Sequence, residues 1–146
     1  MGGEAGRGAL LRNAAQARGL SGSVKRLAWA KANGCPWHEW TTDAIAKLGR
    51  LEALQWAREL DCPWDEGTCA RAAEGGHLHV LRWARANGCP WNEKTCYSAA
   101  AGGHLEVLQW ARQHDCPWDS YTLLSANMCG HPEVAQWARD HGCPTF

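Results

Sequence analysis

The sequence predicts an all-α fold, a solenoid of stacked helix-turn-helix repeats, and three observations support this prediction. The same segment recurs every 27 residues without a gap, so that a Cys-Pro corner ends at Trp37, Trp64, Trp91 and Trp118. Apolar residues within each copy follow a helical period. No stretch alternates apolar and polar residues for long enough to be a convincing strand. A fixed period of this length is typical of folds in which each unit packs only against its neighbours.

Each copy is expected to contain a longer helix with a wide apolar stripe. In the copy at residues 76–102, Leu78, Leu81 and Ala84 recur at helical spacing, and the helix is expected to run to the cysteine of the corner. Gly88 stands where a left-handed residue ends a helix, and Pro90 prevents continuation. Asp takes the place of this glycine in two copies, at Asp61 and Asp115. Such a wide stripe implies neighbours on more than one side.

A shorter helix is expected after each corner tryptophan, which makes every unit a helical hairpin. Small residues such as Cys69 and Ala72–Ala73 give this helix an inward face that allows close packing. The corner joins the longer helix of one rung to the shorter helix of the next, and its tryptophan is expected to cover the gap between rungs. A second tryptophan column runs along the longer helices. The N-caps expected for the shorter helices are Asp65, Asn92 and Asp119.

Length and composition predict one repeat domain in a cytoplasmic or nuclear protein. The 146 residues carry no net charge, and neither a membrane span nor a signal peptide is evident. The eight cysteines are therefore expected to be free thiols. We expect a disordered tail at residues 1–8 and one domain at residues 9–146, with units at 9–21 (partial), 22–48, 49–75, 76–102, 103–129 and 130–146 (partial).

The segments at residues 72–89 and 99–116, "AAEGGHLHVLRWARANGC" and "AAAGGHLEVLQWARQHDC", resemble ankyrin repeats. The resemblance covers about residues 10 to 146 and recurs in several units. The positions that match the family pattern are the alanine pairs Ala72–Ala73 and Ala99–Ala100, the histidines His77, His104 and His131, the apolar residues Leu78, Val80 and Leu81, the Gly-Ala place at Gly88 and Cys89, and the buried leucine place at Cys69, Cys96 and Leu123.

The units also depart from the family pattern. Standard ankyrin units have about 33 residues, and this chain lacks about six of them between Trp91 and the shorter helix. The missing residues are those that form the projecting β-hairpin tip, so the interpretation is a shortened 27-residue variant. Such arrays, rich in "GCPW", are similar to those of giant viruses and some single-celled eukaryotes. If the source is viral, the host cytoplasm is the expected location.

The resemblance implies a non-catalytic scaffold for protein–protein interaction, with no cofactor. We expect the partner to be another protein, not a membrane or a nucleic acid, and to bind the concave side lined by the shorter helices. Specificity is expected in outward positions that vary from unit to unit. By alignment with the family these are Glu39, Ala44, Lys47, Glu66, Arg71, Glu74, Glu93, Ser98, Ala101, Ser120, Ser125 and Met128.

Two alternative functions rest on other recurring residues. A thiolate followed by proline can ligate haem iron, so the recurring Cys-Pro dipeptides allow a second interpretation, in which the chain is a haem- or redox-responsive regulatory module. Their recurrence in every rung favours a structural role instead, with cysteine as a small core residue. The dipeptides begin at Cys35, Cys62, Cys89, Cys116 and Cys143.

The second alternative is binding of a polyanion or nucleic acid by aligned cations. The structural interpretation is that the aliphatic stems of these lysine and arginine side chains cover neighbouring tryptophan rings. The column consists of Lys31, Arg58, Arg85, Arg112 and Arg139.

Metal and catalytic sites are not favoured by the sequence. The cysteines lack the tight spacing of zinc ligands. His77, His104 and His131 occupy equivalent places, which favours hydrogen bonding over proton transfer, and no enzyme is expected. Solenoids need polar capping repeats, and the array reaches Phe146 without one. We therefore expect either a longer protein or self-association through the C-terminal repeat.

Overall fold

The structure consists of α-helices that form hairpins. The computed structural model describes residues 29, 31–34 and 37–145, without the side chains of Glu39 and Trp40. The expected N-terminal tail and the first partial unit lie outside the described residues. Within the described residues the chain has eight helices and no strand, which confirms the all-α prediction.

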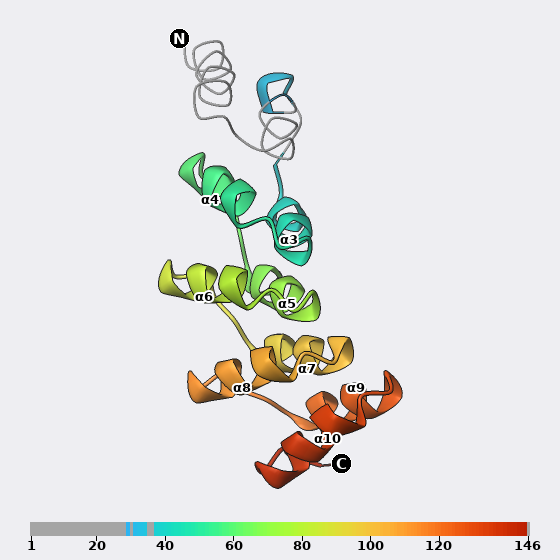
Figure 1. Ribbon diagram of the computed structural model, residues 1–146. Coiled ribbons are helices and arrows are strands. Elements are labelled where there is room, and N and C mark those ends of the chain that lie inside the picture. Colours follow the sequence, from blue (N-terminus) through green and yellow to red (C-terminus); the bar gives the residue numbers. More distant parts are fainter. Residues whose placement is uncertain (1–28, 30, 35–36, 146) are drawn as a thin grey trace.

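Two sets of helices alternate along the chain. We call the helices after each Trp corner the first helices and the others the second helices. The first helices are α3 (Glu39–Lys47), α5 (Glu66–Glu74), α7 (Glu93–Gly102) and α9 (Ser120–Met128). The second helices are α4 (Leu51–Glu59), α6 (Leu78–Ala86), α8 (Leu105–Gln113) and α10 (Pro132–Asp140). The hairpins α3–α4, α5–α6, α7–α8 and α9–α10 are stacked one behind another as rungs (Figure 1).

The expected difference in length between the two helices of a rung is wrong. Each helix has nine residues, apart from ten in α7. Helix α6 ends before Cys89 because Gly88 has a φ of 85° and turns the chain, so that the Cys89 amide donates to the Ala84 carbonyl at 2.9 Å. Asp61 and Asp115 adopt the same left-handed conformation, with φ of 60° and 63°.

The starts of the first helices follow the sequence prediction. Asp65, Asn92 and Asp119 each accept a hydrogen bond from the backbone amide two residues on, at 2.9 to 3.0 Å. These bonds satisfy amides that have no partner inside the helix. The predicted N-caps are therefore confirmed.

The first helices form the inner layer of the stack. Cys69 and Ala72–Ala73 are completely buried, and they have counterparts in Cys96 and Ala99–Ala100 on α7. These small side chains let each first helix pack along the first helix of the next rung, whereas each second helix packs mainly on its own first helix. The solenoid core thus runs between the two layers.

Corner tryptophans link successive rungs, as the sequence predicted. Each corner ring contacts the tryptophan of the second helix in the following rung, so the two tryptophan columns meet. The pairs, with ring-centroid distances, are Trp37–Trp56 (5.8 Å), Trp64–Trp83 (5.8 Å), Trp91–Trp110 (5.9 Å) and Trp118–Trp137 (6.1 Å). Aromatic pairs at such distances stabilise by about 0.5 to 1.5 kcal/mol beyond the burial of their surface.

Histidines link the turns between the two helices of each rung. His77 stands before α6, and its Nε2 lies 2.9 Å from the Lys47 carbonyl of the preceding rung. The ring occupies the space where side chains on Gly49 and Gly75 would lie. A Cβ on Gly75 would also come within 2.6 Å of the Lys47 oxygen, so glycine permits the close approach of the two turns. This geometry supports a structural role for His77.

We predict that alanine at Gly76 destabilises the fold more than alanine at Gly88. Both glycines have positive φ, 74° and 85°, and alanine there costs about 1 to 2 kcal/mol. Only at Gly76 would the added Cβ meet a neighbour, His104 Nδ1 at 2.5 Å, whereas Gly88 faces open space. Overpacking should therefore add about 1 to 3 kcal/mol to the loss of stability at Gly76. Urea unfolding of both variants measures the difference. Equal decreases in the free energy of unfolding of the two variants would contradict this account of the histidine. So would a difference between them that stays the same in a His104→Ala background.

Candidate functional site

A cleft crosses three successive first helices, and we call it the first-helix cleft. It has a volume of about 400 Å³ and lies over α3, α5 and α7. Acidic, basic and aromatic groups line it together, and all of them come from the first helices or from the N-cap of α5. The lining residues are Asp43, Asp65, Glu66, Gly67, Ala70, Arg71, Lys94, Tyr97 and Ser98.

Asp43 gives the cleft an acidic side that other rungs lack. Its Oδ1 accepts a hydrogen bond of 3.0 Å from the Thr68 hydroxyl. Its Oδ2 lies where a side chain on Gly67 would stand, 2.6 Å from that Cβ position. Burial raises the pKa of Asp43 against the lowering effect of the Thr68 hydrogen bond, and the nearby Asp65 carboxylate raises it further. The carboxyl is held in place by its neighbours.

The residues equivalent to Asp43 on the next two rungs are Ala70 and Tyr97. Consequently the hydroxyls of Thr95 and Thr122, which correspond to that of Thr68, are buried without a hydrogen-bond partner in the described part of the chain. The polar contact at the start of the cleft is therefore specific to one rung interface.

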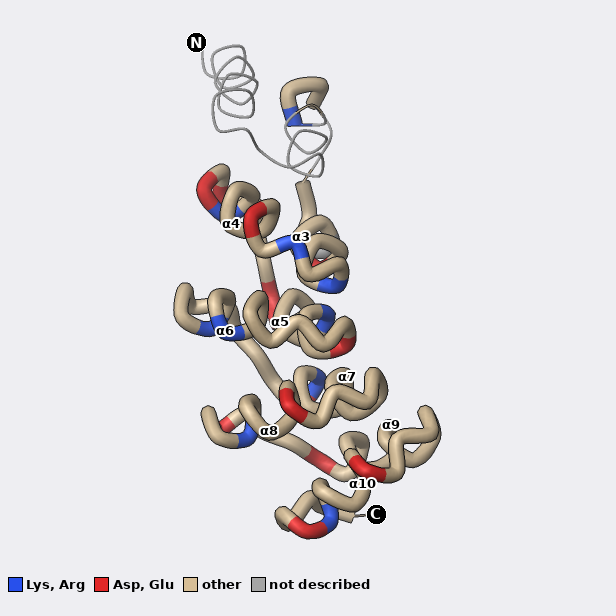
Figure 2. Tube along the Cα trace, in the orientation of Figure 1, with Lys and Arg blue, Asp and Glu red and all other residues tan. Residues whose placement is uncertain are grey.

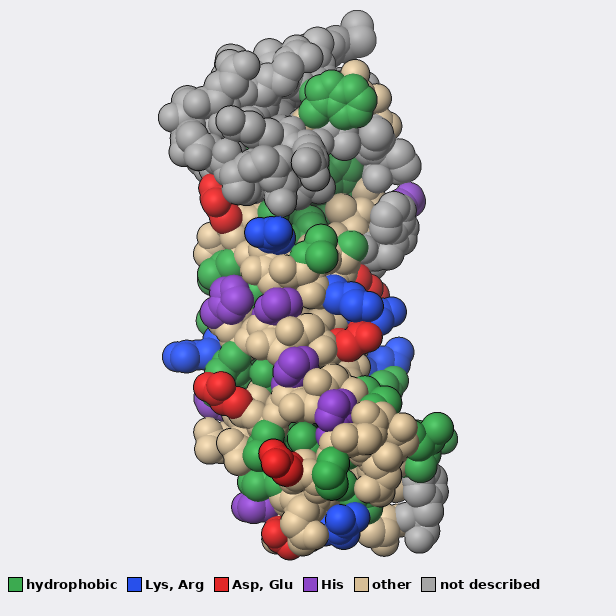
Figure 3. Space-filling view, turned by 45° about the vertical axis from the view of Figure 1, so that its right-hand side comes forward, with side chains coloured by type: hydrophobic (Ala, Val, Ile, Leu, Met, Phe, Trp, Pro, Cys, Tyr) green, Lys and Arg blue, Asp and Glu red, His purple; other side chains and the backbone are tan. Residues whose placement is uncertain are grey.

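A second charged cluster joins α3 to α5. Glu74 lies 2.7 Å from Arg71 and 3.6 Å from Lys47. Burial opposes ionisation of Glu74, but the Arg71 hydrogen bond and the Lys47 charge outweigh it, so the pKa of Glu74 is lowered. Figure 3 shows acidic and basic side chains together beside a line of histidines on one face of the stack.

The residues predicted for the partner face all belong to first helices. Glu66, Arg71 and Ser98 meet in the cleft, and Lys47, Arg71 and Glu74 form the charged cluster. Ala44 and Met128 are exposed, and Glu93, Ala101, Ser120 and Ser125 are half-buried, outside both groups. Glu39 begins α3, but its side chain lies outside the described part.

Several cleft residues were missed because only three positions per rung were considered. Asp43, Ala70, Tyr97 and Leu124 occupy one equivalent position and differ in every rung. Lys94 and Tyr121 vary in the same way at another position, where α5 has Gly67. The criterion that selected the predicted residues, variation from unit to unit, would also have found these. What it could not show is which of them share one cleft.

The arginine column is engaged in the corners of the rungs. Arg58, Arg85 and Arg112 lie 4.3 to 4.4 Å from the ring centroids of the corner tryptophans that follow them. Each also donates to the carbonyl of the corner cysteine at 2.5 to 2.6 Å, and Lys31 lies 5.2 Å over Trp37. Figure 2 shows basic and acidic residues interspersed along the described part of the chain. This geometry supports the structural interpretation over a ladder of free cations.

The four described corner cysteines, Cys62, Cys89, Cys116 and Cys143, are buried, so none of them is an accessible haem ligand. The Cys89 thiol donates to the Asp65 carbonyl at 3.4 Å, and Cys116 and Cys143 make the equivalent bonds. A hydrogen bond with Cys89, together with burial, raises the pKa of the Cys69 thiol. Cys35 lies outside the described residues. The seven described cysteines are free thiols, and no cluster of three or more potential metal ligands occurs in the described part.

Stacked helical hairpins with a variable inner face define the class of helical-repeat proteins. Residues 69–112 match the sequence model "Ankyrin repeats (many copies)", which confirms the resemblance to ankyrin repeats in that part of the chain. No curated protein matches the chain. Ankyrin repeats are generally modules that bind other proteins. In the described part, every helix is too short to cross a membrane.

We predict that Glu74→Gln lowers the free energy of unfolding at pH 7 by at most about 1 kcal/mol, because the ion pairs are partly exposed. Since the folded pKa is lowered, this stabilisation is present above the ordinary value of 4.5 and is lost as the pH falls through the folded pKa. Urea titrations between pH 7 and 3 measure the difference. In a Lys47→Met/Arg71→Met background Glu74→Gln should no longer lower the free energy of unfolding, because burial then disfavours the carboxylate. A loss of stability that persists in this background would contradict the role of the two cations.

We predict that Cys129 is the fastest of the described thiols to react with Ellman's reagent in the folded protein. Cys129 is exposed, whereas the six others are buried. In a Cys35→Ser background, Cys129→Ser should remove the fast phase, and the remaining thiols should react only in denaturant. Rapid labelling of Cys89 in the folded protein would contradict the buried corner.

Proposed function

We propose that this protein is a non-catalytic interaction scaffold that binds a partner protein in the first-helix cleft. One observation carries the proposal: residues that vary between rungs converge from three first helices on one cleft, while the repeated residues are buried in the core. The first helices also pack more closely than the second helices, so the stack should curve toward them. A concave face of this kind is the usual binding surface of a solenoid.

The chemistry of the cleft favours a polar segment of the partner. Asp43 and Glu66 offer acceptors, Arg71 and Lys94 offer cations, and Tyr97 adds aromatic surface. Interfaces that combine an aromatic anchor with charged groups are typical of protein partners. A helix or loop that carries both signs of charge fits this lining better than a small apolar ligand.

Free thiols support a reducing compartment, the cytoplasm or the nucleus, as the place of this interaction. None of the seven described cysteines forms a disulfide, although six of them recur at equivalent places in the stack. Disulfides form and persist in oxidising compartments. The partner is therefore expected among cytoplasmic or nuclear proteins.

We predict that Lys94→Glu and Tyr97→Ser each weaken partner binding by about tenfold, the range expected for a central interface residue. Lys94 is exposed, so the melting temperature should stay unchanged in that variant. The measurement is affinity capture from a lysate with native and variant protein, followed by titration of the captured partner.

His79→Glu is the matched control for this experiment. His79 is exposed on α6, and α4, α8 and α10 carry Glu52, Glu106 and Glu133 at the equivalent place. The control should therefore fold and bind the partner as the native protein does. If Lys94→Glu and Tyr97→Ser both bind the partner with native affinity, the interface lies outside the first-helix cleft.

A further inference from the structure

Clefts on the second-helix side repeat from rung to rung. One lies between α6 and α8 and has a volume of about 610 Å³, and another lies between α8 and α10 with about 450 Å³. Equivalent residues line both: an arginine, a corner tryptophan, the tryptophan of the next second helix and a histidine. These are Arg85, Trp91, Trp110 and His114 in the former, and Arg112, Trp118, Trp137 and His141 in the latter.

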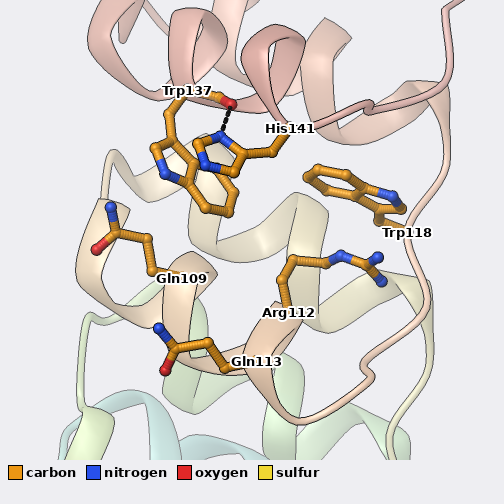
Figure 4. Close-up of a pocket in the computed structure, with 6 residues that line it drawn as sticks. All are labelled: Gln109, Arg112, Gln113, Trp118, Trp137 and His141. Atoms are coloured by element: carbon orange, nitrogen blue, oxygen red, sulfur yellow. Dashed lines mark hydrogen bonds between the residues drawn. The ribbon is translucent and has the colours of Figure 1, made fainter.

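The two indoles of each cleft form an open notch. The rings of Trp118 and Trp137 meet at 65°, and those of Trp91 and Trp110 at 67°. His141 is stacked on Trp137 at 4.1 Å and extends that wall, as Figure 4 shows. The same pairs of rings meet at Trp37–Trp56 and Trp64–Trp83, so the notches continue along the stack.

This shape disfavours a flat ligand. A nucleotide base binds single-strand proteins by stacking on a free aromatic face. Here Arg112 lies over Trp118 at 4.4 Å, and His141 covers a face of Trp137. A compact prolyl ring, in contrast, fits between two rings that meet at an angle, and aromatic-lined grooves bind polyproline II segments.

The repeat of the notches also matches a polyproline II helix. One turn of that helix has three residues and is about 9 Å long. Packed helices lie about 8 to 10 Å apart, so successive notches can each receive a residue from successive turns. A polyproline II helix leaves its carbonyls without internal partners. The amide groups of Gln109 and Gln113, which line the cleft at α10, can donate to them.

Charge selects an acidic segment. Arg82 and Arg85 line the cleft at α6, and Arg112 lines the cleft at α10. Among the described residues that line these two clefts there is no carboxylate. Acidic side chains between the prolines would therefore meet only cations and neutral groups.

We propose that the second-helix side is a docking surface for an acidic, proline-rich segment of a protein in the polyproline II conformation, held in the Trp91–Trp110 and Trp118–Trp137 notches. It is separate from the first-helix cleft, so the chain presents two surfaces.

A short peptide of Pro-Pro-Glu repeats tests the proposal by calorimetry and tryptophan fluorescence. The native protein should bind it, and should bind neither a Gly-Ser-Glu peptide of equal charge nor a Pro-Pro-Lys peptide. Lys94→Glu in the first-helix cleft should leave the binding unchanged, which separates this surface from the proposed function.

Two double variants that preserve the fold locate the site. His114→Asn/His141→Asn removes the imidazole that extends one wall of each notch but keeps the bond to the helix carbonyl, because Asn87 makes the same bond at 2.8 Å in the rung before His114. Ala86→Glu/Gln113→Glu introduces the residue that α4 has at this place, Glu59. Each double variant should bind the Pro-Pro-Glu peptide about tenfold or more weakly than the native protein, as expected when an interface anchor or its charge complement is lost.

Several outcomes would overturn the proposal. These are no binding of the Pro-Pro-Glu peptide, equal binding of the Gly-Ser-Glu peptide, or affinity unchanged in both double variants. Binding of an oligothymidylate in place of the peptide, lost in the same variants, would instead make this side a nucleic-acid surface.

Discussion

The corner between one rung and the next holds the solenoid together. At the corner that ends in Trp91, the Cys89 thiol donates to the Asp65 carbonyl at 3.4 Å and closes the rung on itself. Arg85 donates to the Cys89 carbonyl and lies over the Trp91 ring, whose edge contacts Trp110 of the next rung. A cation–π contact contributes about 0.5 to 2 kcal/mol, depending on exposure. One tryptophan thus joins two rungs, and the same arginine and tryptophan contacts recur at the corners that end in Trp64 and Trp118.

Much of the fold could be predicted because its causes are local and repeated. The cap at Asp65, the left-handed residue at Asp115 and the buried thiol of Cys69 each depend on a residue type at a fixed place in the period. The equal lengths of the two helices were not predicted. Gly88 was expected to end the helix and its positive φ does so, but the helix already ends at Ala86, before Cys89, and periodicity alone does not indicate where a turn begins.

The contacts between rungs were harder to predict than the rungs. The sequence places Trp91 and Trp110 in two separate columns, and only the offset between a corner and the next second helix brings their rings to 5.9 Å. The interaction of His77 with Gly49 and Gly75 depends in the same way on how close two turns approach. Distances between rungs follow from side-chain volumes on both partners, and a period found in one chain segment does not contain them.

The candidate sites lie where the repeat changes from rung to rung. Asp43 fits against Gly67, Ala70 is followed at the same offset by Lys94, and the ring of Tyr97 contacts that of Tyr121 at 6.4 Å. The residue pair at this offset therefore changes from one rung interface to the next. Because the buried thiols, alanines and capped helix ends already stabilise the stack, these surface pairs can differ without loss of the fold. Even the two buried threonine hydroxyls without partners are tolerated, although each such group costs about 1 to 3 kcal/mol. This separation between repeated core and variable surface is what allows one architecture to present a charged cleft on its first helices and aromatic notches on its second helices.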